Sequence, residues 1–122
     1  MAEQTLNTVA QAIGLGSVGF GALATVAPGA LRRAYGDPTG GGGSLDYFGR
    51  TWGSRTATLG ALILMASADA ERKRIATLSA VMNAVDLLAA FRAVGVPTRP
   101  RTMAALTSAA FAVASGYVAA NL

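Results

Sequence analysis

The side chains with the greatest chemical capacity lie where the sequence is otherwise apolar. Asp86 is the single charged residue between Ile75 and Phe91, and Arg55 directly precedes an uncharged run from Thr56 to Ala68. A carboxylate can act as a general acid or base, and a guanidinium can polarise a carbonyl, epoxide or alkoxide oxygen. We therefore take Asp86 and Arg55 as the candidate catalytic residues.

Further polar residues lie at helical spacing around this pair. Ser79, Asn83 and Asp86 are separated by four and three positions, so they share one face of a helix. Together with Arg50 and Trp52, Ser79 and Asn83 are our candidate substrate-binding residues. Two alternatives remain open: the stripe is an interhelical hydrogen-bond network that holds a bundle together, and Trp52 belongs to an aromatic belt at a membrane boundary.

The composition excludes several kinds of chemistry. The chain has neither cysteine nor histidine, which excludes disulfides, thiolate nucleophiles, zinc sites of the Cys/His kind and a Ser-His-Asp triad. The segment from Gly14 to Gly19 spells GxGxxG, but no strand precedes it, as a dinucleotide site would require. We expect these small residues to allow close helix packing, and we expect no cofactor and no metal.

Long uncharged runs indicate the elements that must position the polar residues. Charged residues make up 13% of the chain, against roughly 25% in ordinary soluble domains, and a helix needs about 20 mostly apolar residues to cross a bilayer. We predict an all-α fold, an integral membrane four-helix bundle in a single domain spanning residues 1–122. Its helices are predicted at about 5–31, 46–68, 75–94 and 102–120. The first joint contains Pro38 and the glycines at 40–43.

The composition also suggests a soluble bundle or a nucleic-acid-binding protein, and the sequence favours neither over a membrane protein. A soluble alanine-rich bundle would show a broad charged face on its helices, whereas residues 102–122 contain no charge. The net charge of +4 suggests nucleic acid, but the basic residues form no continuous stripe. We expect a multi-pass protein of the cell membrane, with the lipid bilayer as a partner and no nucleic acid.

The predicted topology places the two central charges at a similar depth. Arg55 lies nine residues past Asp46, and Asp86 lies eight residues before residue 94, so both are about 12–13 Å from the same side at about 1.5 Å per residue. We therefore predict a buried Arg55–Asp86 ion pair. Arg50 lies one turn from Asp46, which suits a local pair between these two residues.

The second predicted helix also carries a resemblance. The pattern Arg-x-aromatic-Gly-x-Arg at Arg50–Arg55 is similar to that of a family of small four-span membrane proteins of unknown function, and more distantly to DoxX-type membrane proteins. Pro28, the Tyr35–Gly36 pair and Asp86 fit the closer family as well. The resemblance implies the four-span fold and no reaction. The histidine that relatives often carry near the last helix and the cysteine pair of DoxX-type redox partners are both absent.

Three functions remain open at this stage. The first is a membrane-embedded pocket that binds a lipophilic small molecule and, in a catalytic version, isomerises it, cyclises it or opens its epoxide without a cofactor. The second is a non-catalytic scaffold or assembly subunit, acting as a homo-oligomer or with a partner membrane protein. The third is a small oligomeric transporter in which Asp86 would be the ion site.

Overall fold

Helices form nearly all of the described chain. The structure is a computed structural model that describes residues 2–36, 43–93 and 95–122, and it contains no strand within these ranges. The glycine run at positions 40–42 lies outside them. The helices are α1 (Ala2–Val26), α2 (Pro28–Ala34), α3 (Gly43–Met65), α4 (Asp69–Phe91) and α5 (Thr98–Asn121). The all-α part of the predicted fold class is confirmed.

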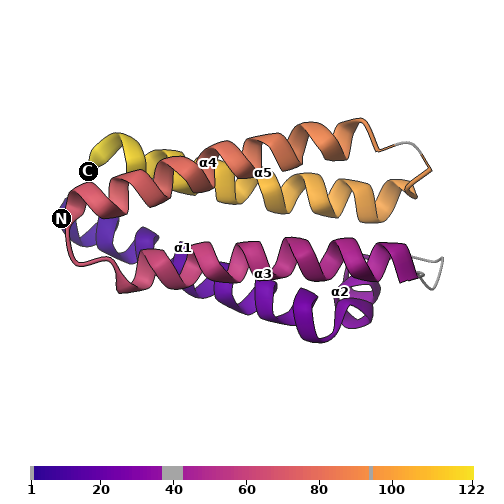
Figure 1. Ribbon diagram of the computed structural model, residues 1–122. Helices are drawn as coiled ribbons and strands as arrows, with labels where there is room; N and C mark the ends of the chain where they lie inside the picture. The colour runs from indigo at the N-terminus through magenta and orange to yellow at the C-terminus, as the bar shows by residue number, and fades with distance from the viewer. Residues whose placement is uncertain (1, 37–42, 94) are drawn as a thin grey trace.

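The four long helices form two antiparallel pairs that lie side by side (Figure 1). The helix α1 packs along α3, and α4 packs along α5. The two chain termini and the α3–α4 connection lie at one end of the bundle, while α2 and the α4–α5 connection lie at the other (Figure 1). We call these the terminal end and the α2 end.

Small residues bring α1 and α3 into close contact. A Cβ atom added to Gly21 would lie 2.5 Å from the carbonyl oxygen of Gly53, and one added to Gly60 would lie 2.7 Å from that of Gly14. These distances leave no room for any side chain. The GxGxxG segment therefore serves helix packing at Gly14, as its apolar context predicts, whereas Gly19 faces open space.

The first helix differs from the prediction because it breaks near residue 27. Pro28 has no backbone N–H and disfavours helical geometry in the residue before it. Ala27 accordingly leaves the helix at φ −136° and ψ 65°, and Pro28 begins the short α2. The continuous helix predicted for 5–31 is thus two helices, and Leu31 belongs to α2.

The helices α4 and α5 begin earlier than predicted, within charged sequence, whereas α3 and α4 each end three residues before the predicted bound. The helix α4 begins at Asp69 rather than near residue 75, because Asp69 and Glu71 in its first turn interact favourably with the helix dipole. The helix α5 begins at Thr98, with Pro100 in its first turn. Charges that a hydropathy argument assigns to loops therefore belong to helix ends.

Among the helices of the described ranges, α1, α4 and α5 are long and apolar enough to cross a membrane. The helix α3 has a similar length but carries Asp46 and Arg50 in its first half and Arg55 near its middle. The buried apolar cluster lies toward the terminal end and includes Ile13, Ile63 and Val118. Hollows occur at both ends: a pocket that includes Val118 lies at the terminal end, and small residues surround another at the α2 end.

Candidate functional site

The centre of the candidate site is an ion pair between α3 and α4. The Nη2 atom of Arg55 lies 2.6 Å from Oδ2 of Asp86, which confirms the predicted pair. Their side chains are 39% and 21% exposed, respectively, so the pair is only partly enclosed and not, as predicted, buried. Arg55 Nε is buried and has no hydrogen-bond partner within the described ranges. The pair ties together two helices that otherwise pack only lightly against each other.

Trp52 adds a second hydrogen bond to the same carboxylate. Its indole Nε1 donates to Asp86 Oδ2 over 3.2 Å, and it can do so because Trp52 and Arg55 lie three positions apart on one face of α3. Among the residues that the structure describes, nothing donates to the other oxygen, Oδ1. The carboxylate is therefore held by two hydrogen bonds to one oxygen, while the other oxygen has no donor among the described residues.

Asp86 lines a cavity at the α2 end of the bundle. The cavity has a volume of about 350 Å³, within the range of roughly 300–1,000 Å³ that is usual for small-molecule sites. The space is left by four alanines, because larger side chains at these positions would fill it: Ala89 and Ala90 on α4, Ala93 just after α4, and Ala104 on α5. The lining residues are Leu31, Tyr35, Trp52, Asp86, Ala89, Ala90, Ala93, Ala104, Thr107 and Ser108.

Two hydroxyl groups also line the cavity, that of Tyr35 directly after α2 and that of Thr107 on α5. The hydroxyl of Tyr35 donates to Thr107 Oγ1 over 3.0 Å, and the hydroxyl of Thr107 donates to the carbonyl of Met103 over 2.8 Å. Because both hydroxyl protons are used, the Tyr35 oxygen offers only lone pairs. Tyr35 and Asp86 therefore both present acceptors to a molecule in the cavity.

The predicted polar stripe on α4 divides between two neighbouring helices. The hydroxyl of Ser79 is buried and lies 3.0 Å from that of Ser115 on α5. Asn83 Nδ2 donates to the carbonyl of Ser79 over 2.8 Å. Neither Ser79 nor Asn83 is among the residues that line the Asp86 cavity. Ser79 takes the interhelical role that the stripe also allowed, whereas the hydrogen bonds of Asn83 stay within α4.

Arg50 is not brought to the cavity either. It is exposed on α3, and the expected local pair with Asp46 does not form. The carboxylate of Asp46 instead lies 3.1 Å from Nε of Arg32 on α2. The sequence argument considered only spacing within one helix, whereas the break before Pro28 brings α2 close enough to compete for Asp46.

Several residues of the cavity were missed by the sequence argument. Tyr35 enters the sequence analysis only through the Tyr35–Gly36 pair of the family resemblance, and Thr107 and Ser108 belong to an uncharged run. Alanines at helical spacing carry no signal that distinguishes a cavity wall from close packing. The only usable hint was the aromatic Tyr35 directly after α2.

Searches against protein-family models, curated proteins and solved structures find no match for this chain. The resemblance to the small four-span family therefore stays a prediction.

Proposed function

We propose that the chain is an integral membrane protein in which all four long helices cross the cell membrane. Three of them are long and apolar enough to do so. The fourth, α3, runs antiparallel along α1, and its deepest charge, Arg55, is paired with Asp86. Pairing supports this placement because an unpaired charge at membrane depth costs at least about 2.5–3.5 kcal/mol.

The outward faces of the helices support the same placement. Leu78, Val81, Val85 and Leu88 follow one another at helical spacing on α4, and each is more than half exposed. Val113 on α5 is 73% exposed. Exposed apolar faces of this extent are characteristic of surfaces covered by lipid or by a partner.

Within this membrane protein, we propose that the Asp86 cavity binds a lipophilic small molecule that carries a hydrogen-bond donor. The observation that carries the proposal is the asymmetry of the Asp86 carboxylate, with Oδ2 held by Arg55 and Trp52 and Oδ1 open. The rest of the wall is mostly apolar, which favours a lipophilic body. The Tyr35 oxygen provides a second acceptor in the lining.

The charge balance favours a neutral donor such as a hydroxyl. Arg55 already compensates the negative charge of Asp86 at 2.6 Å, so a cationic ligand would have to be desolvated without a free counter-ion. An alcohol or phenol gives up only its hydrogen bonds to water and regains one to Oδ1. We therefore name a lipophilic alcohol as the ligand class.

Binding is better supported than catalysis. Isomerisation, cyclisation or epoxide opening would require a group that polarises the substrate oxygen. Arg55 was predicted for that role, but its guanidinium binds Asp86, and Arg55 is not among the residues that line the cavity. Its position supports a role in holding the carboxylate.

The experiment compares small molecules that co-purify with the wild-type protein and with two variants in mild detergent. Asp86→Asn weakens the acceptor, and Ala104→Phe fills the cavity while leaving the ion pair intact. Asp69→Asn is the matched control, since it makes the same change in the exposed first turn of α4. Extracts are analysed by mass spectrometry, with helicity measured in parallel.

We expect a lipophilic hydroxyl compound with the wild type and with Asp69→Asn, and its depletion from the other two variants. Identical extracts from all four proteins would contradict the proposal. If Asp86→Asn then changed only oligomer size or stability, the scaffold function would be favoured.

A further inference from the structure

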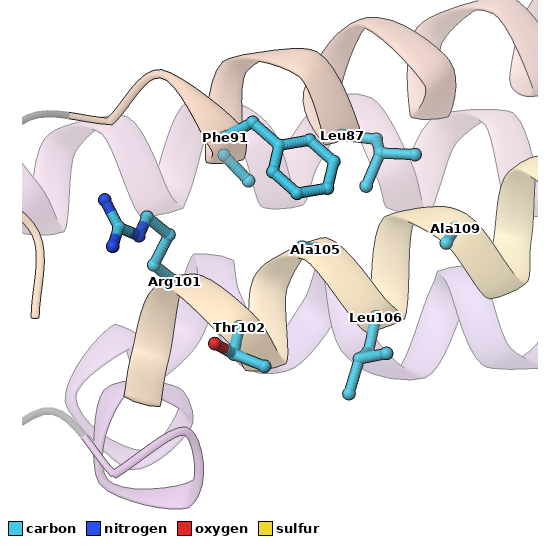
Figure 2. A pocket seen from close by; sticks show the side chains of 8 residues that line it. Leu87, Phe91, Arg101, Thr102, Ala105, Leu106 and Ala109 are labelled. Atoms are coloured by element: carbon cyan, nitrogen blue, oxygen red, sulfur yellow. The ribbon is translucent and has the colours of Figure 1, made fainter. Parts of the chain in front are cut away.

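A second hollow lies between α4 and α5 at the α2 end, and the proposed function does not use it. It is a groove of about 540 Å³, bounded by Leu87, Ala90, Phe91, Arg101, Thr102, Ala105, Leu106 and Ala109. Figure 2 shows apolar side chains from both helices along its length and the guanidinium of Arg101 at one end, beside Phe91. Only Ala90 also lines the Asp86 cavity.

Arg101 is the one charged residue among those that line the groove, and the neighbouring sequence adds only positive charge. The sequence from 92 to 101 contains Arg92, Arg99 and Arg101 and no acidic residue. Arg101 forms no ion pair with any residue in the described ranges. The Thr102 side chain beside it is exposed. This end of the groove therefore presents a cation and a hydroxyl, a combination suited to a phosphate group.

The length of the groove fits one leaflet of a bilayer. From Arg101 to Ala109 the helix rises by roughly 12 Å at about 1.5 Å per residue. The hydrocarbon core of a bilayer is about 30 Å thick, so one leaflet has roughly half that depth. A molecule with its charged group at Arg101 would extend its apolar part alongside Leu106 to about the depth of a lipid chain.

We propose that this groove binds one anionic phospholipid, with its phosphate on Arg101 and Thr102 and an acyl chain between α4 and α5. The inference rests on the proposed membrane location but not on the Asp86 cavity. Charge complementarity selects this occupant: a zwitterionic lipid brings a cationic choline or ethanolamine group to Arg101, which has no ion-pair partner among the described residues, whereas phosphatidylglycerol brings none.

The test is native mass spectrometry of the purified full chain after equilibration with equal amounts of phosphatidylglycerol and phosphatidylcholine of identical acyl chains. We expect phosphatidylglycerol adducts to predominate. Arg101→Gln should lower their abundance about fivefold, which corresponds to about 1 kcal/mol for one basic residue near an anionic lipid. Arg74→Gln, which removes the same charge from an exposed position at the terminal end, should leave the abundance unchanged.

A second variant tests the apolar part of the groove. Ala105→Phe should reduce adducts of both lipids because its ring occupies the space of the acyl chain, while Arg101→Gln should change only the preference between them. Equal binding of the two lipids to the wild type, or equal losses in Arg101→Gln and Arg74→Gln, would overturn the inference.

Membrane fractionation of the same proteins separates this inference from the proposal on which it rests. A chain found outside the membrane fraction would refute the proposed location. A chain found in the membrane fraction without lipid preference would refute the phospholipid site alone.

Discussion

The Arg55–Asp86 pair offers the sharpest test of how α3 and α4 are held together. Substituting Asp86→Asn leaves the Arg55 charge without a counter-ion, while the double substitution Arg55→Gln with Asp86→Asn removes both charges. If the pair is as close as the 2.6 Å distance indicates, the first change should destabilise the protein more than the second.

The magnitude follows from the enclosure of the pair. Exposed ion pairs contribute about 0–1 kcal/mol, and removing one partner of a fully buried pair costs about 3–5 kcal/mol. With side chains 39% and 21% exposed, this pair lies between those limits. We expect Asp86→Asn to lower the free energy of unfolding by about 2 kcal/mol and the double variant to lose clearly less.

The assay is a double-mutant cycle with unfolding in mixed micelles, followed by circular dichroism as denaturing detergent is added. Arg50→Gln is the matched control, because Arg50 is an exposed arginine on the same helix, and it should change the free energy by less than about 0.5 kcal/mol. Effects of the two single substitutions that simply add in the double variant would refute the reasoning.

Three further predictions concern packing and hydrogen bonds. Gly21→Ala should destabilise the α1–α3 contact by about 2 kcal/mol or more through overpacking. Gly116→Ala, where a Cβ meets open space, should be neutral or stabilising by up to about 1 kcal/mol. Unfolding titrations of the two variants compare these effects, and equal changes in the free energy of unfolding would contradict the observed packing. Ser115→Ala should cost about 0.6 kcal/mol by removing the bond to Ser79, and an unchanged unfolding midpoint would show that this bond contributes nothing. Trp52→Phe keeps the ring but loses the 3.2 Å donor to the carboxylate, so the same titration should show a loss of about 1.5 kcal/mol, and no loss would argue against that bond.

The sequence predicts the site best where two opposite charges lie at the same predicted membrane depth. The ion pair could be predicted because Arg55 and Asp86 are rare charges in apolar sequence, and helical rise places them at one level. The hydrogen bond from Trp52 to the Asp86 carboxylate could not be predicted, because the aromatic belt already explains a tryptophan near a membrane boundary. Its indole reaches Asp86 only through the rotation of α3 about its axis, which hydropathy does not determine.

The same limit explains the other differences. Ser79, Asn83 and Asp86 share a face of α4, but that face is wide enough to meet α5 on one side and α3 on the other, so one stripe serves two contacts. The cavity exists because side chains such as that of Ala104 are small. The sequence does not distinguish an alanine that leaves a cavity from an alanine that packs closely against a neighbouring helix. The break before Pro28 could have been predicted from proline chemistry, and it brings α2 against the bundle.

Photolabelling tests most directly the claim that the Asp86 cavity holds a lipophilic alcohol. The probe is a long-chain alcohol bearing a diazirine, applied to the membrane-embedded wild-type chain and to Ala104→Phe, with labelled positions mapped by peptide sequencing. The account predicts concentrated labelling within residues 86–93 and 104–108 of the wild type, diminished by excess unlabelled alcohol and by Ala104→Phe. Labelling spread evenly over the outward apolar faces, and unchanged in the variant, would contradict it.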